Sequence, residues 1–419
     1  MRHSRVGHIN FHYGWIIVAV GTLCIFACLG LGRFALGMLL PSMAASLNLS
    51  YAEMGFISTG NFVGYLIAVL VSGFLVTKIG ARKLIFMAMI LIGSTMIFSG
   101  MSQGFLYLLI IYTLTGIGSG AANVPIMALI TSWFDSSMRG RASGFVVIGS
   151  GFAIILSGKL IPFINEIYHA DGWRIGWYVL GSLVLAIAFI ALALLKDSPG
   201  EIGLKPIGSG TFMPSIQQIC NTATDKSVYK RGVLYHLGSI YFLFGFTYVI
   251  YATFIVTTLV KERGFPESVA GNFWAVLGFL SLFSGPVFGS LSDKFGRKTG
   301  FVIVFSLQMI AYLLIASQLS GIFLYLSVGL FGIAAWSIPS IMAAAVGDYA
   351  GPEKMAKAFG LVTFIFGFGQ IAGPAVAGTL AELRGSFTLS FLMAAAFAGI
   401  AIIFSIFLRK PLPSQRPVR

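Results

Sequence analysis

Long apolar runs, broken only by short polar joints, are the feature that most constrains the fold of this 419-residue chain. Only 10% of its residues are charged, whereas about a quarter are charged in soluble domains. A soluble chain of this length needs a charged surface, which this composition cannot supply. A membrane-crossing helix needs roughly 20 consecutive apolar residues, and many runs here reach that length. Most of the outer surface is therefore expected to face lipid.

The runs predict an all-α membrane protein with twelve transmembrane helices in two six-helix halves around a central cavity. We place the halves at 1–195 and 232–419, joined at 196–231 by a polar linker rich in Pro, Ser and Thr. The run from Gly14 is longer than the apolar part of a signal peptide, so it is expected to remain as the first helix. The spans are predicted at 14–43, 52–76, 84–101, 105–130, 142–164, 175–195, 234–259, 268–290, 300–317, 321–346, 356–381 and 387–408.

The basic residues predict the orientation in the membrane. Of the 27 Lys and Arg residues, 21 fall in one set of joints and five in the opposite set, with Arg33 left inside a span. Cytoplasmic loops carry the excess of Lys and Arg. Both termini are therefore predicted to be cytoplasmic, in the inner membrane of the cell. This placement accounts for the net charge of +14 without any nucleic-acid partner.

Two polar joints repeat each other at the same place in the two halves. The joint after the second span reads Gly-Phe-Leu-Val-Thr-Lys-Ile-Gly-Ala-Arg-Lys from Gly73. The joint after the eighth span reads Gly-Ser-Leu-Ser-Asp-Lys-Phe-Gly-Arg-Lys from Gly289. Self-similarity at corresponding places on either side of a linker indicates an internal duplication.

The second copy resembles the signature loop of the major facilitator superfamily, and the resemblance covers essentially the whole chain. The first copy departs from that pattern at Thr77 and Ala81. In the family the loop latches the cytoplasmic side of the outward-open state. The resemblance implies that Asp293 meets the start of the fifth helix near Arg141, and that Thr77 forms a weaker latch. The alternative is that these residues only set topology and turns. The predicted gating set is Gly73, Thr77, Gly289, Asp293, Gly296, Arg297, Lys298 and Arg141.

Three shorter stretches resemble particular branches of that superfamily. The start Tyr-Gly-Trp-Ile-Ile-Val from Tyr13 is similar to the monocarboxylate and oxalate/formate branches. The stretch from Gly32 to Pro41, with Gly-Asn-Phe-Val-Gly-Tyr from Gly60, looks more like the YbfB-type branch. These matches do not define a substrate.

Arg33 is the most informative single residue, because a charge inside a span is costly. Insertion scales assign roughly 2.5–3.5 kcal/mol to an Arg at a helix centre. No Asp or Glu falls in the middle of any predicted span to pair with it. An unpaired guanidinium on a central cavity suits an anion, and Arg binds a carboxylate with two parallel hydrogen bonds. The alternative is that Arg33 satisfies helix-end carbonyls or reaches outward to the interface.

Uncharged polar residues inside other spans complete the candidate substrate site. A cavity for an organic ion needs hydrogen-bonding and aromatic groups of this kind. Each of them could instead pack or hold helices together. The predicted substrate-binding residues are Arg33, Asn61, Tyr65, Asn123, Tyr248 and Gln370.

These features together predict a secondary active transporter that moves a small organic anion, most simply a carboxylate, by alternating access. One alternative is a multidrug exporter, although exporters of lipophilic cations need a buried carboxylate. A non-transporting membrane sensor is the other, and flux in proteoliposomes distinguishes it. No phosphate-binding Gly-rich loop or metal-ligand spacing is visible, so we expect no enzyme activity, cofactor or metal. Expected partners are the anion, a co-transported proton or counter-anion, and the lipid bilayer, with the chain acting as a monomer.

Overall fold

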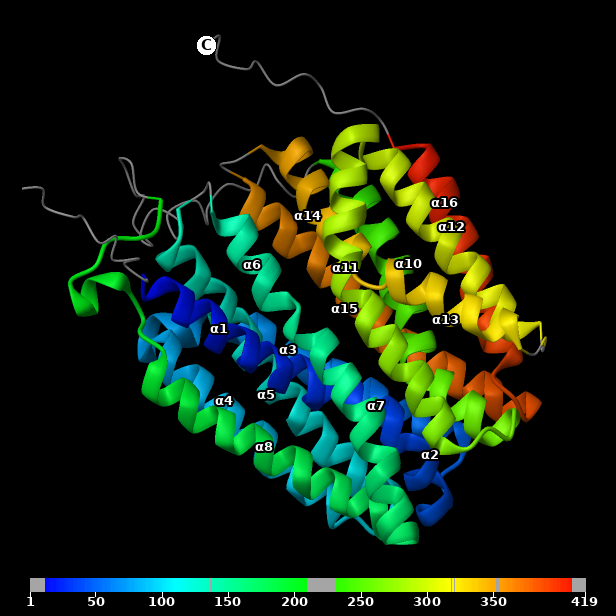
Figure 1. Ribbon diagram of the computed structural model, residues 1–419. Helices are drawn as coiled ribbons and strands as arrows, with labels where there is room; N and C mark the ends of the chain where they lie inside the picture. The colour runs from blue at the N-terminus through cyan, green and yellow to red at the C-terminus, as the bar shows by residue number, and fades with distance from the viewer. Residues whose placement is uncertain are drawn as a thin grey trace, which may run out of the picture.

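The computed structural model describes residues 12–135, 138–208, 231–317, 319, 321–351 and 354–408, which are mostly helical (Figure 1). Within these ranges, eleven continuous helical stretches are long and apolar enough to cross a membrane. One stretch of 56 residues, Arg139–Leu194, would measure about 84 Å if straight, against roughly 30 Å of hydrocarbon. His169, with a φ of 48°, divides it into α7 and α8, which pack on each other. The predicted all-α membrane fold is confirmed. Counting α7 and α8 separately would give twelve spans, a count that stays a prediction.

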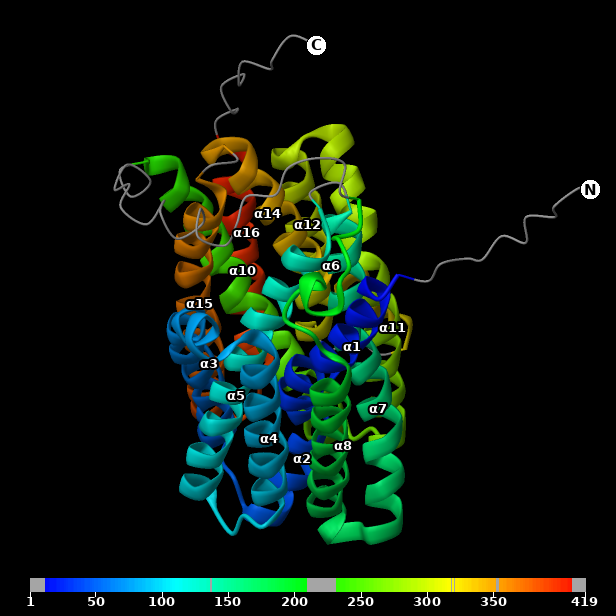
Figure 2. The same ribbon diagram turned by 90° about the vertical axis from the view of Figure 1, so that its left-hand side faces the viewer.

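The helices gather in two groups (Figures 1 and 2). The first group contains α1 (Gly14–Ile25), η1 (Phe26–Phe34), α2 (Ala35–Leu47), α3 (Tyr51–Ile79), α4 (Ala81–Gly100), α5 (Phe105–Trp133), α6 (Arg139–Val147), α7 (Gly149–Tyr168), η2 (His169–Asp171) and α8 (Gly172–Leu194). After η3 (Pro199–Ile202), the second group contains α10 (Gly232–Thr257), η6 (Thr258–Glu262), α11 (Glu267–Phe295), α12 (Arg297–Ala316), α13 (Ile322–Ala334), α14 (Ser337–Ala350), α15 (Met355–Arg384) and α16 (Thr388–Ile406). The linker bounds stay a prediction, since 209–230 lie outside the described residues.

Two glycines end equivalent helices in the two groups. Gly80, between α3 and α4, has a φ of 82°, and Gly296, between α11 and α12, has a φ of 92°. Residues with side chains rarely adopt these backbone angles, so glycine at each position permits the turn. The same backbone conformation at the same place in both signature joints supports the internal repeat that the sequence indicates.

Many large apolar side chains point outward from the bundle. Leu106 on α5 is 65% exposed and Phe189 on α8 is 59% exposed, and large exposed apolar residues occur on most of the other long helices. A soluble protein rarely exposes contiguous apolar surface of this extent. The surface therefore suits a hydrocarbon environment, as expected for a multi-pass membrane protein.

Among the described residues, helix backbones of the two groups approach each other closely toward one end of the molecule. At the end where α3 and α11 begin, which we call the closed end, a Cβ on Gly55 would lie 2.4 Å from the carbonyl oxygen of Pro374 on α15. A Cβ on Gly158 of α7 would lie 2.6 Å from the Gly271 carbonyl oxygen on α11. At the opposite end, which we call the open end, a Cβ on Gly73 would meet no atom within 4 Å. Glycine thus lets helix backbones of the two groups meet at the closed end.

Candidate functional site

Arg33 lies on the π-helical segment η1, within the first membrane-crossing stretch. A π-helix closes its hydrogen bonds from residue i to i+5 and is frequent at functional sites. Side chains of α5 support this segment, because Tyr112 donates to the Arg33 carbonyl at 2.9 Å and Ser119 donates to the Cys28 carbonyl at 2.7 Å. The backbone that carries Arg33 is therefore held in place from the side.

The guanidinium of Arg33 is buried among aromatic rings. Its central carbon lies 4.1 Å from the ring centroid of Tyr65 and 4.6 Å from that of Phe62, and the residue is 8% exposed. A desolvated cation–π contact contributes roughly 2 kcal/mol, so two of them offset much of the roughly 2.5–3.5 kcal/mol cost of inserting the charge. The Nε and Nη2 atoms find no hydrogen-bond partner among the described residues. Arg33 is thus stabilised without an acid, and these two nitrogen atoms remain available.

Two of the other predicted residues of the first group lie beside Arg33. Asn123 on α5 donates to the Tyr65 hydroxyl at 2.8 Å, and its own Oδ1 is buried without a partner in the described chain. Asn61 instead lies between helices, where it donates to the Tyr112 carbonyl at 3.2 Å. Tyr65 and Asn123 therefore form one cluster with Arg33, while Asn61 supports the helix packing behind it.

The second group contributes an aromatic wall. Gln370 on α15 donates to the Tyr248 hydroxyl on α10, and both side chains are 2% exposed. The Tyr248 ring stacks on Phe244 at 4.7 Å and meets Trp336 edge-on at 5.7 Å. Trp336 also lies 4.9 Å from Phe34 of the first group, so aromatic contacts cross the interface here. The predicted pair Tyr248 and Gln370 is thus brought together next to the η1 segment.

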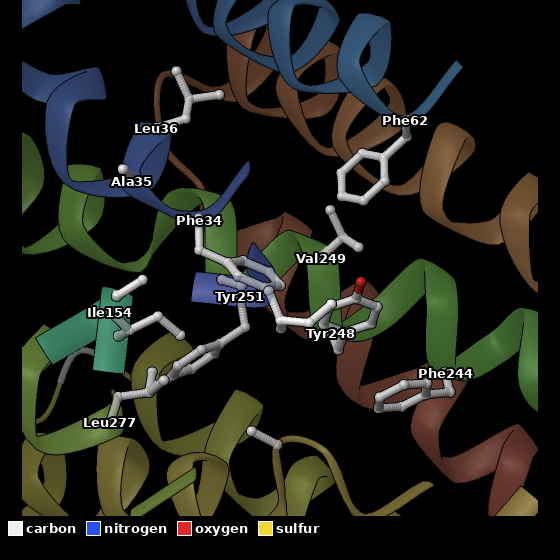
Figure 3. Close-up of a cluster of buried hydrophobic side chains, with 14 of the residues drawn as sticks. Phe34, Ala35, Leu36, Phe62, Ile154, Phe244, Tyr248, Val249, Tyr251 and Leu277 are labelled. Atoms are coloured by element: carbon white, nitrogen blue, oxygen red, sulfur yellow. The ribbon is translucent and has the colours of Figure 1, made fainter. Parts of the chain in front are cut away.

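A pocket lies between the two groups where these clusters meet. In Figure 3, Phe62 of α3 and Val249 of α10 point toward one another, with Tyr248 beside them. The charged lining group is Arg33, and the rest of the lining is aromatic, aliphatic or hydroxyl-bearing. The pocket is lined by Arg33, Phe34, Leu36, Gly37, Ser58, Phe62, Tyr248, Val249, Ala252 and Thr253.

Eight of the ten lining residues were missed by the sequence reasoning, among them Phe62, Ser58 and Thr253. Phe62 is three residues from Tyr65, and Ser58 is four residues from Phe62, so these side chains share a face of α3. This helical spacing from the predicted residue Tyr65 could have identified both Phe62 and Ser58 as pocket residues. Thr253, which faces the pocket from α10, gave no comparable signal, because hydroxyl residues are common inside membrane helices.

The complete signature joint forms an ion-pair network inside the second group. Arg297 forms an ion pair with Asp293, and its Nε donates to Asp348 at 2.8 Å. Lys298 and Arg141 are exposed. The contact between Asp293 and the start of the fifth span stays a prediction, which concerns the state that is closed at this end.

The incomplete joint is organised differently. Thr77 donates to the Phe74 carbonyl of its own helix at 2.8 Å, and its hydroxyl forms no hydrogen bond to the second group within the described part of the chain. A carboxylate from a distant part of the chain caps the helix that follows this joint. Asp197 accepts a hydrogen bond of 2.6 Å from the backbone nitrogen of Arg82 at the start of α4. A carboxylate at a helix N-terminus is electrostatically favourable. Sequence reasoning did not find this acid, which lies more than a hundred residues away along the chain.

Polar side chains join the two groups at the closed end. Glu382 of α15 caps the first turn of α3, accepting a hydrogen bond of 2.8 Å from the backbone nitrogen of Tyr51. Two further side-chain pairs cross the interface nearby. They are Asn165 with Glu267, and Lys159 with Asn272. These contacts must break if the two groups separate at this end.

A family model described as "Uncharacterised MFS-type transporter YbfB" matches residues 25–406. The chain belongs to this family of the major facilitator superfamily. The fold agrees, because the chain is similar to a bacterial homologue of the lysosomal transporter Spinster, solved inward-facing and unoccupied. The TM-score is 0.76 at 15% identity, over 96% of this chain and 98% of that one. It is also similar to the nucleoside transporter NupG, with a TM-score of 0.71 at 14% identity, over 95% and 99% of the two chains.

Curated relatives of this YbfB-family member are transporters rather than enzymes. The "Probable sulfoacetate transporter SauU" of Cupriavidus necator is 24% identical over 95% of both chains. The "Hexuronate transporter" of Bacillus subtilis is 26% identical over 89% of this chain and 90% of the relative. Human "Monocarboxylate transporter 2" is 24% identical over 94% of this chain and 84% of the relative. The predicted superfamily and the general transport function are therefore confirmed.

Proposed function

We propose that this protein is a secondary active transporter that moves a small organic anion, with the carboxylate bound by Arg33. The observation that carries the proposal is the buried guanidinium whose Nε and Nη2 atoms have no partner among the described residues. Buried polar groups are nearly always hydrogen-bonded, so an unpaired cation at a pocket suits an anionic ligand. The names of the sulfoacetate, hexuronate and monocarboxylate transporters agree with an anionic cargo.

The pocket position supports alternating access. Arg33, Phe62 and Ser58 come from the first group, whereas Tyr248 and Thr253 come from the second. A ligand bound here touches both groups, so their relative rotation exposes it to one end and then the other. If the termini are cytoplasmic, as the charge distribution predicts, the closed end is external and this conformation is open inward.

The coupling partner is not specified by this site. The acids of the described chain lie toward the ends of the membrane-crossing stretches, as Glu382 and Asp348 do. A co-transported proton would therefore be carried at a helix end or on the substrate itself, and exchange against a counter-anion requires no such group. A cation exporter is disfavoured for the same reason, because the charged group at this pocket is Arg33.

Arg33 substitutions test the proposal in proteoliposomes. A charge-assisted hydrogen bond contributes roughly 1.5–3 kcal/mol, or about ten- to hundredfold in affinity. We expect Arg33→Lys to weaken carboxylate uptake, because Lys lacks the planar fork, and Arg33→Gln to weaken it further. The measurement is radiolabelled carboxylate uptake across a range of concentrations, together with the melting temperature in detergent.

Arg174 provides the matched control. It donates to the Gly100 and Ser102 carbonyls away from the pocket, so Arg174→Gln also removes a partly buried arginine charge. Its uptake KM should stay near that of the wild type. Wild-type uptake by a well-folded Arg33→Gln protein would refute the anion site. If Arg33→Gln cannot fold, the structural role of Arg33 is favoured instead.

A further inference from the structure

A pair of hydroxyl groups from opposite groups of helices lines the same pocket as Arg33. Ser58 comes from α3 and is 3% exposed, and Thr253 comes from α10 and is 7% exposed. Their oxygens lie 3.3 Å apart, which is long for an O–H···O hydrogen bond, usually about 2.7–2.8 Å. The pair therefore contributes little to holding the two groups together.

These two hydroxyls differ from others inside the bundle. Thr22, Thr115 and Thr247 each donate to a carbonyl one turn back in their own helix, as hydroxyls in membrane helices commonly do. Neither Ser58 nor Thr253 makes such a bond in the described chain. A hydroxyl carries one proton, and a single bond between the two uses one proton of the pair. One proton therefore remains without an acceptor inside the pocket.

The Tyr248 hydroxyl adds to this surplus of donors. It accepts a hydrogen bond from Gln370, while its own proton has no acceptor among the described side chains. The pocket thus has hydrogen-bond donors without an acceptor at two places. One place is Arg33 with Tyr248, and the other is the pair Ser58 and Thr253. A ligand that satisfies both must bring an acceptor to each.

We propose that Ser58 and Thr253 form the second half of the substrate site, where they bind a neutral oxygen of a short hydroxylated monocarboxylate. The proposal rests on the proposed function, because Arg33 holds the carboxylate. Ser58 precedes Phe62, whose ring lies against the Arg33 guanidinium, by one helical turn of about 5.4 Å along α3, so one short ligand can reach both places. Arg33 is the ionised lining group, so one negative charge on the ligand balances the site.

Uptake of matched acids by the full chain in proteoliposomes tests the proposal. The probes are acetate with glycolate, butanoate with 3-hydroxybutanoate, and malonate for a second charge. We expect the hydroxylated member of at least one pair to have a KM about three- to tenfold lower, the range that one hydrogen bond supports. Ser58→Ala and Thr253→Val should bring that ratio close to one. Thr253→Ser, which keeps a hydroxyl at this position, should retain the preference.

Ser390 provides the matched control. Its hydroxyl is buried and donates to the Ala377 carbonyl on a neighbouring helix, but it does not line the pocket. Ser390→Ala should leave the ratio unchanged, and melting temperatures report any variant that folds poorly. Arg33-dependent uptake with equal KM values within both pairs, or with malonate preferred, would overturn this inference alone. A wild type that takes up none of the five acids would overturn the proposed function as well.

Discussion

The Glu382 carboxylate lies 2.8 Å from the backbone nitrogen of Tyr51, so a side chain of α15 caps the first turn of α3. The helix N-terminus carries a partial positive charge, which favours a carboxylate at this position. The two residues belong to different groups of helices, and the contact exists only while the closed end is shut.

Glu382→Gln should loosen the closed end. Loss of a charge at a helix N-terminus should lower the equilibrium constant for closing this end about two- to fivefold. The measurement uses Ser58→Cys in a background without Cys24, Cys28 and Cys220, labelled by an impermeant maleimide added at the closed end. We expect labelling to be faster by that factor.

Glu53 offers the comparison for this experiment. Its carboxylate accepts from the Ser50 backbone nitrogen at 2.9 Å, so it caps the same helix from within the first group. Glu53→Gln should lower thermal stability without accelerating the labelling. Equal labelling rates for Glu382→Gln and the wild type would show that the cap does not hold the closed end.

Gly55→Ala should shift the protein away from the conformation described here. A Cβ at this position would lie 2.4 Å from the Pro374 carbonyl oxygen and 3.1 Å from the Gly378 Cα, so α3 and α15 must move apart. Labelling of the same cysteine from the closed end should increase. Gly73→Ala is the control, because a Cβ there meets no atom within 4 Å in this conformation. Unchanged labelling in Gly55→Ala would indicate that the helices adjust without opening.

Asp293→Asn should slow turnover with little effect on thermal stability. The Asp293 side chain is 66% exposed where it pairs with Arg297, and exposed ion pairs contribute roughly 0–1 kcal/mol. A latch in the opposite state would nevertheless lose a charged contact. Turnover in proteoliposomes should fall more for Asp293→Asn than for Thr77→Ala, and Thr77→Asp adds the acid that the first joint lacks. Equal and negligible effects would leave these residues with a topology-setting role.

The membrane-crossing helices could be predicted from the sequence because hydropathy and chain length determine them. The span predicted at 84–101 forms α4, Ala81–Gly100, and the span predicted at 105–130 forms α5, Phe105–Trp133. The interruptions at Ile148, and at Ala335 and Trp336, could not be predicted, because the sequence remains apolar on both sides.

The candidate site was only partly predictable for a geometric reason. Arg33 was identifiable because a lone charge in an apolar run is costly wherever its side chain points. For Asn61 and Tyr65, helical periodicity indicates that both lie on related faces of α3, but not which neighbour each one meets. Asn61 lies against the Tyr112 carbonyl, and Tyr65 lies against Arg33. The arrangement of neighbouring helices decides between the two roles, and one sequence does not contain it.

The π-helical segment from Phe26 to Phe34 affects how this chain is aligned with other chains. A turn that closes from residue i to i+5 takes in one residue more than an α-turn. A homologue whose first helix is α-helical throughout therefore needs a one-residue gap within this segment. An alignment without the gap pairs Arg33 with the neighbour of its counterpart, and a survey of that column would undercount the arginine. Aligning Gly14–Ile25 and Ala35–Leu47 as separate blocks avoids the error.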